Sequence, residues 1–175
     1  MRKYLKIFLV FVISFVLVGC GNNSEDVEKE PNGKIAEEKE EVKTKVVSCK
    51  LEKEDTANSY TLVTTYELTV EDEIVKQNKM KEVITSSSQD MLTYFETYMK
   101  TTYESMNSKY GGYEYSITND GKQVISNTTI DYTKVDIEKM VEDDASMKLM
   151  VNSDNKVTLS GVKTVYKTLG IECDE

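Results

Sequence analysis

The chain has 175 residues, with 22 Lys and Arg against 31 Asp and Glu and no His, so its formal net charge is −9. Three of the basic residues lie among the first six positions, so the rest of the chain carries 19 − 31 = −12. This balance argues against a nucleic-acid partner, whose phosphates require Lys and Arg, and permits a cationic one. The alternative is that the acidity only keeps a surface protein soluble.

The N-terminus has the layout of an export signal. Arg2, Lys3 and Lys6 precede residues 7–18, which are apolar except for Ser14. A helix of this length measures about 18 Å, whereas the hydrocarbon core of a bilayer is about 30 Å thick. The run is therefore too short to span a membrane and has the length of a signal-peptide core.

The signal ends in Leu17-Val18-Gly19-Cys20, which resembles the lipobox of bacterial lipoproteins. The resemblance implies cleavage between Gly19 and Cys20 and a diacylglyceryl group on the Cys20 sulfur, because a thiol is the nucleophile that forms the thioether. We therefore expect residues 1–19 to be a signal peptide and the protein to be extracytoplasmic, held on the cell membrane by lipid. The alternative is a plain signal peptide with an incidental cysteine.

Residues 20–42 predict a lipidated cysteine followed by an acidic, disordered tether. Residues 21–41 contain eight acidic side chains and three lysines, and their apolar side chains are Val27, Ile35 and Ala36. So few apolar groups cannot offset the entropy of ordering the segment. Residues 43–175 remain, a length that suits one domain with its own core.

Cysteine usage predicts a disulfide. If Cys20 is lipidated, Cys49 and Cys173 remain, and two thiols in an oxidising compartment usually pair. The alternative is two buried free thiols that behave as small apolar groups. Because imidazole is absent and two thiols are too few for a structural zinc site, we expect no tight transition-metal site, and no cofactor motif is recognised.

The first part of the domain predicts strands. Residues 46–49 indicate a short first strand, and residues 62–70 alternate between apolar and polar side chains, the pattern of a half-buried strand. Glu71-Asp72-Glu73 is a polar turn. Residues 74–84 form a weaker, lysine-rich partner strand, whose lysines suit a solvent face or a protected edge.

A long amphipathic helix follows. Ser87-Ser88-Gln89-Asp90 has the form of a capping box, and Gly111-Gly112 marks the end of the helix. Its apolar stripe comprises Leu92, Phe95, Met99, Tyr103, Met106 and Tyr110. Tyr94 and Tyr98 lie off the stripe and form a possible binding surface; the alternative is that they are boundary tyrosines with solvated hydroxyls.

The second half of the domain predicts a hairpin and two shorter helices. Asp120-Gly121 is a type I′ turn signal, which would place Ile117 opposite Val124, Tyr115 opposite Ser126 and Tyr113 opposite Thr128. Thr133-Lys134-Val135-Asp136 is a capping box for a short helix, and residues 144–157 fit a strand or a helix extension. Ser160 would cap the last helix, Gly170 would end it, and Ile171-Glu172-Cys173 would return beside the first strand.

These elements predict an α+β fold. An antiparallel sheet of two hairpins and short terminal strands would pack against one long and two shorter helices. Asn152-Ser153-Asp154-Asn155 is a turn whose oxygens could bind calcium weakly, but a plain Asx turn explains it better.

Besides the lipobox, four motifs that together span most of residues 45–172 can be compared with known proteins. They are Val75-Lys76-Gln77, Lys109-Tyr110, Thr129-Ile130-Asp131-Tyr132-Thr133-Lys134-Val135-Asp136 and Leu169-Gly170. In this order the motifs resemble those of the YehR-like bacterial lipoproteins, a small family without an assigned molecular function. The resemblance implies a compact α+β lipoprotein domain at the cell envelope. It offers no catalytic residues to transfer, and the positions of Cys49 and Cys173 are outside the family's shared pattern.

Three functions compete at this point. The first is a non-catalytic binding or accessory module that engages a cationic protein, a peptide or a glycan. The second is an envelope hydrolase, which without His would need paired carboxylates or a Ser/Lys arrangement. The third is a transporter-associated ligand-binding lipoprotein, although such receptors usually close two domains around a hinge. The first explains the anchor and the tether, and we predict that the protein is not an enzyme.

Overall fold

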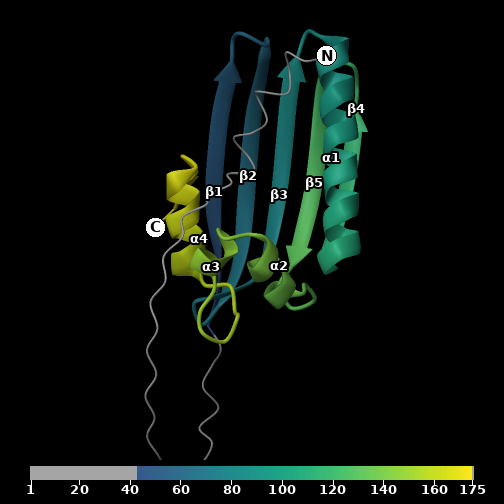
Figure 1. Cartoon of the computed structure of the whole chain (residues 1–175). Coiled ribbons are helices and arrows are strands. Elements are labelled where there is room, and N and C mark those ends of the chain that lie inside the picture. Colours follow the sequence, from purple (N-terminus) through teal and green to yellow (C-terminus); the bar gives the residue numbers. More distant parts are fainter. Residues whose placement is uncertain (1–42, 175) are drawn as a thin grey trace, which may run out of the picture. The chain divides into compact units, whose positions relative to one another are not determined.

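The computed structural model describes residues 43–174 of the chain (Figure 1). The predicted signal peptide, its cleavage site at Gly19 and Cys20, and the predicted tether of residues 20–42 lie outside the described residues. In the part that is described, no helix is long and apolar enough to cross a membrane.

The described residues form an α+β fold built on one six-stranded antiparallel sheet with the strand order β4-β5-β3-β2-β1-β6. The elements are β1 (Thr44–Asp55), β2 (Tyr60–Glu71), β3 (Ile74–Ser86), α1 (Gln89–Tyr110), β4 (Tyr113–Asn119), β5 (Gln123–Asp131), α2 (Ile137–Asp143), α3 (Met147–Met150), α4 (Leu159–Thr168) and β6 (Glu172–Cys173).

The predicted fold class is confirmed, with two differences in its parts. The first strand is not short, because β1 has 12 residues and pairs with β2 along its whole length. Three helices accompany the long α1 within residues 43–174 instead of two, because the ambiguous segment 144–157 contains the one-turn helix α3.

One face of the sheet carries the core. Alternate residues of β2 from Leu62 to Val70 are buried, as their period-two pattern predicts. The register places buried β1 residues beside them, with Val47 opposite Leu68 and Cys49 opposite Tyr66. The helices pack on this same face.

Helices α1 and α4 cover different parts of that face. Helix α1 covers the β3-β5-β4 side, where Tyr103 packs on Tyr115 with ring centroids 5.8 Å apart. Helix α4 covers the β1-β2 side, where Tyr166 packs on Tyr66 at 4.9 Å. The opposite face bears the exposed or half-exposed members of each strand, so the sheet is covered by helices on one side.

The β4–β5 hairpin shows a different register from the one predicted. Tyr115 lies opposite Thr128 and Ile117 opposite Ser126, each two residues further along than the sequence predicted. Gly121, with φ 81°, is the first central residue of the observed turn. In the predicted type I′ turn, Asp120 would be the first central residue and Gly121 the second. Asp120 fixes this turn, because its carboxylate accepts hydrogen bonds from the backbone N–H groups of residues 122 and 123, both at 2.8 Å.

Each predicted helix start is displaced by one to three residues. Ser88 caps α1 by accepting a hydrogen bond from Met91 N, Asp136 and not Thr133 caps α2, and Thr158 and not Ser160 caps α4. The apolar stripe of α1 is buried at five of its six predicted positions, and Met106 is the exception with 37% exposure.

Candidate functional site

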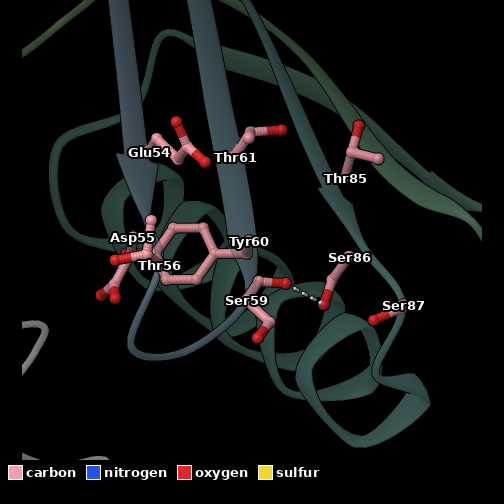
Figure 2. Close-up of a pocket in the computed structure, with 9 residues that line it drawn as sticks. All are labelled: Glu54, Asp55, Thr56, Ser59, Tyr60, Thr61, Thr85, Ser86 and Ser87. Atoms are coloured by element: carbon pink, nitrogen blue, oxygen red, sulfur yellow. Dashed lines mark hydrogen bonds between the residues drawn. The ribbon is translucent and has the colours of Figure 1, made fainter.

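An open pocket of about 220 Å³ lies where β1 turns into β2 and β3 turns into α1 (Figure 2). We call this the distal end, because β1 runs the full length of the sheet between it and Lys43, where the described chain begins. The pocket is lined by Glu54, Asp55, Thr56, Ser59, Tyr60, Thr61, Thr85, Ser86 and Ser87.

Strand pairing builds one wall of this distal pocket. Glu54, Thr61 and Thr85 are directly opposite one another on β1, β2 and β3, so their side chains emerge side by side on the exposed face of the sheet (Figure 2). The next row, Asp55 and Tyr60, ends the β1–β2 pairing, and the ring of Tyr60 extends toward Asp55 in the same view.

Short polar contacts fix the floor of the pocket. The Asp55 carboxylate accepts hydrogen bonds from Asn58 N at 3.0 Å and Asn58 Nδ2 at 2.8 Å, which closes the β1–β2 loop. The Ser86 hydroxyl donates to the Ser59 carbonyl at 2.8 Å and so ties this loop to the end of β3. The pocket is therefore shaped by side-chain bonds between two turns, a feature that the strand pattern of the sequence does not reveal.

The lining is acidic and rich in hydroxyl groups. Its nine residues include two carboxylates, from Glu54 and Asp55, and no Lys or Arg. Burial raises the pKa of the Tyr60 hydroxyl, and the nearby charge of Asp55 and the neighbouring Tyr94 add to the increase. The electrostatic environment of the pocket thus favours a positive ligand group.

A series of aromatic rings leads from the pocket wall onto α1. The ring of Tyr60 meets that of Phe95 edge-on at 4.9 Å between centroids, and Phe95 meets Tyr94 at 5.6 Å. Tyr94 stacks on Tyr98 with centroids 6.1 Å apart and an interplanar angle of 19°. The structure thus places the two tyrosines of the predicted binding surface on one helix face, next to the distal pocket, with Tyr94 38% exposed.

The two cysteines of the domain lie on β1 and β6, at the edge of the sheet opposite β4. Cys49 of β1 is directly opposite Cys173 of β6, and their sulfurs form a disulfide with an S–S distance of 2.07 Å. The two Cα atoms are 3.9 Å apart, which is shorter than the about 4.4–6.8 Å usual for disulfides. Neither cysteine lines the distal pocket, and their bond links the first strand to the last.

A second polar cluster lies under α1. Glu82 stands between Thr64 and Ser126 in one cross-strand row, and the Tyr103 hydroxyl donates a hydrogen bond to Glu82 Oε2. The Ser126 and Thr128 hydroxyls are 3.3 Å apart and fully buried. Burial raises the pKa of Glu82, while hydrogen bonds from Tyr103 and Ser126 oppose the increase.

The Glu82 cluster differs from the pair that a hydrolase would need. Glu82 contacts hydroxyl groups, and within the described residues this cluster contains a single carboxylate. Glycoside hydrolysis uses two carboxyl groups about 5–9.5 Å apart, one as acid and one as nucleophile or base. Among residues 43–174, no group of three or more His, Cys, Asp or Glu could hold a metal ion.

The raised pKa of Glu82 predicts a pH dependence of stability that Glu82→Gln removes. A carboxyl whose folded-state pKa exceeds its unfolded value favours folding most below the unfolded value, here 4.5, and this contribution is lost as pH rises through the folded-state pKa. We therefore expect the melting temperature of the wild type, relative to Glu82→Gln, to fall as pH rises above about 4.5. Each unit of pKa difference corresponds to about 1.4 kcal/mol.

The comparison between the two proteins isolates Glu82. Hydrogen bonds lower the pKa of Asp120 and Asp143, so these two carboxyls change the stability with pH in the opposite direction to Glu82. Because the wild type and Glu82→Gln both contain them, their contribution cancels in the comparison. Thermal unfolding followed by circular dichroism from pH 4 to pH 8 gives the difference directly. A difference that stays constant over this range would contradict the assignment.

Comparisons with known proteins give two likenesses in solved structures. No protein-family model matches the chain, and no curated protein matches it. The NMR structure of a protein from Streptococcus pneumoniae TIGR4 is similar over 89% of this chain and 100% of its own, with 12% identity and a TM-score of 0.47. The NMR structure of the E. coli YehR protein is similar over 74% of this chain and 91% of its own, with 17% identity and a TM-score of 0.49. Membership of the YehR-like family stays a prediction.

Proposed function

We propose that the protein is a non-catalytic binding module of the cell envelope, anchored through lipid on Cys20, that engages its partner at the distal end of the domain. The observation that carries this proposal is the continuity of the distal pocket with the rings of Tyr60, Tyr94 and Tyr98. Tyrosine rings at an exposed site provide large contact area at a low cost in conformational entropy, which is why they are frequent in binding surfaces.

The position of the pocket fits an anchored protein. The chain enters the domain at the end of β1 that holds Thr44, and the pocket lies at the other end, beyond Asp55. A strand of 12 residues is about 40 Å long. A partner at the distal end would therefore bind at the end of β1 that lies away from Lys43, where the described chain begins.

The openness of the distal pocket supports binding over catalysis. Strong electrostatic catalysis depends on preorganised groups in a site from which water is excluded. Here the lining faces the solvent across the exposed rows of the sheet, and Glu54 and Thr61 are exposed. A hydrolase that uses carboxylates and a transporter-associated ligand-binding lipoprotein are the alternatives, and no observation in the described residues favours either.

Site-specific photocrosslinking in intact cells tests the proposed site. A photoreactive amino acid at Thr56, which is exposed in the pocket loop, should give a discrete crosslinked species. The matched control is the same amino acid at Lys148 of α3, which is also exposed but lies near the opposite end of the sheet (Figure 1). Equal crosslinking from both positions, or none from Thr56, would overturn the proposed function.

The anchor is tested separately by Cys20→Ala. Because the thioether requires the thiol of Cys20, we expect this variant to lose all labelling by an alkyne fatty acid and to remain as uncleaved precursor or be released from the membrane. The matched control is Val18→Ala, since a lipobox accepts a small or aliphatic residue at that position. Membrane retention of a normally processed Cys20→Ala protein would show that the lipobox interpretation is wrong.

A further inference from the structure

The hydrogen-bonding groups of the distal pocket are mostly acceptors. The carboxylates of Glu54 and Asp55 can only accept, and the surrounding Ser and Thr hydroxyls can accept as readily as they donate. No Lys or Arg lines the pocket to neutralise the two carboxylates. The ligand group that complements such a lining is positively charged and donates hydrogen bonds without accepting any.

We propose that the distal pocket binds a primary ammonium group, supplied by a lysine side chain of a basic peptide segment. This inference rests on the proposed function and adds the chemical class of the ligand to it. A lysine ammonium has three donors and no acceptor, so it can donate to the Glu54 carboxylate and to the hydroxyl of Thr61, its direct neighbour on β2.

The size of the pocket agrees with a side chain. Pockets for drug-sized ligands and cofactors measure about 300–1,000 Å³, whereas the distal pocket measures about 220 Å³ and is open to one side. It therefore has room for one extended side chain, whose backbone would remain outside. The rest of the peptide would then lie across the neighbouring surface.

Tyrosine rings at the pocket also favour an ammonium group. An ammonium group is attracted to the face of a tyrosine ring within about 6 Å, by roughly 0.5–1 kcal/mol at exposed sites. Tyr60 lines the pocket itself, and Tyr94 and Tyr98 continue from it along α1. The ring of Tyr60 can therefore add to the attraction of the pocket for the ammonium group.

A neutral glycan is the competing ligand, because sugars also stack on tyrosine rings. Sugar hydroxyls both donate and accept, so a site for them gains from donors as well as acceptors. The excess of carboxylates in the lining, and the charge of −12 carried by residues 20–175, favour the cation.

The test compares one cationic probe with two neutral ones on the full-length protein in detergent. Labelled pentalysine is titrated at low ionic strength, and its binding is followed by fluorescence anisotropy, with the fully acetylated peptide and chitotetraose as neutral probes. We expect pentalysine to bind, the acetylated peptide not to bind, and Glu54→Gln to weaken pentalysine binding about two- to fivefold.

The charge-matched control is Glu67→Gln. Glu67 is exposed on the same face of the sheet but does not line the pocket, so its loss should leave pentalysine affinity unchanged. Both substitutions are isosteric and on the surface, and melting curves of the two variants establish that they remain folded. Amide NMR shifts of Thr61 and Thr85 on addition of pentalysine locate the ligand independently.

Each other outcome has a defined meaning. Equal weakening by Glu54→Gln and Glu67→Gln indicates diffuse attraction to an acidic protein and overturns the pocket. Binding of chitotetraose with shifts at Thr61, without binding of pentalysine, overturns the cationic ligand but leaves the binding module intact. If neither ligand binds while Thr56 still crosslinks to a partner, the ammonium proposal alone fails; if Thr56 gives no crosslink either, the proposed function fails with it.

Discussion

Reduction of the disulfide between Cys49 and Cys173 is expected to lower the free energy of unfolding by about 5 kcal/mol. The two residues are 124 positions apart, so the bond closes almost the whole domain into one loop. Closing a loop of this length removes entropy from the unfolded chain, and the chain-entropy relation gives about 5 kcal/mol. For a domain of this size such a loss should lower the melting temperature by about 10 °C or more.

The disulfide also secures a strand that has little else to hold it. Strand β6 has two residues and pairs with β1 at Cys49 and Lys50. Just beyond it, Asp174 N donates to the Ser48 carbonyl at 2.9 Å, and before it Ile171 is buried in the core. Without the disulfide we expect this C-terminal segment to separate from β1 before the rest of the sheet unfolds.

Melting curves with and without a reductant measure this effect. The double variant Cys49→Ser/Cys173→Ser is the control, because it should melt at the lower temperature under both conditions. Mass spectrometry after alkylation under non-reducing conditions provides a second measurement. Two freely alkylated thiols in the folded protein, or identical melting temperatures with and without reductant, would contradict the prediction.

The regular periodicities of the sequence predicted the fold well. The alternation of residues 62–70 gave a strand with the correct buried face, and the helical stripe from Leu92 to Tyr110 gave α1 with one exposed exception. Both signals come from side chains that a single packed layer buries, so each repeats within its own element. Such elements can be recognised before their partners are known.

Strand β1 was underestimated because its stability comes from pairing. Its second half, residues 50–55, consists of charged residues apart from Leu51, a composition that disfavours strands. Even so it pairs with β2 as far as Asp55 opposite Tyr60, since the outward positions Lys50, Glu52 and Glu54 can face solvent. Only the neighbouring strand makes this segment a strand.

In the β4–β5 hairpin the predicted register is wrong, but the predicted face of each side chain is correct. The shift is two residues, which equals the side-chain period of a strand. Tyr115, Ile117, Ser126 and Thr128 therefore remain on the face of the sheet that α1 covers. A shift of one residue would have moved all of them to the other face.

The candidate site was predicted only in part. Tyr94 and Tyr98 were recognised because they lie off the apolar stripe of α1. The pocket beside them joins the ends of three strands with the loop at residues 56–59, and its residues are adjacent only after the sheet has formed. Single Ser, Thr and Asp residues next to turns are common in any sequence, so no local signal distinguishes these.

Substitution of Gly161 by Ala is expected to destabilise the domain by about 1–3 kcal/mol, the usual cost of overpacking a core. Gly161 is buried on α4 where this helix approaches α3. A Cβ atom at this position would come within 2.5 Å of the Leu149 carbonyl oxygen and 2.7 Å of Met150 Cα. Both contacts involve backbone atoms, which cannot rotate away as a flexible side chain could.

The sign of this effect depends on the contact with α3. Within a helix, Ala is favoured over Gly by about 1 kcal/mol, so without α3 the substitution would stabilise the protein. The matched control is Ser160→Ala, in the same turn of α4 but exposed, which should change stability by less than about 0.5 kcal/mol. Urea unfolding of both variants separates the effect of helix propensity from the effect of the contact with α3. A loss of stability in Gly161→Ala alone can arise only from the close approach of the two helices. A Gly161→Ala protein as stable as Ser160→Ala would contradict the close approach of α4 to the backbone of α3.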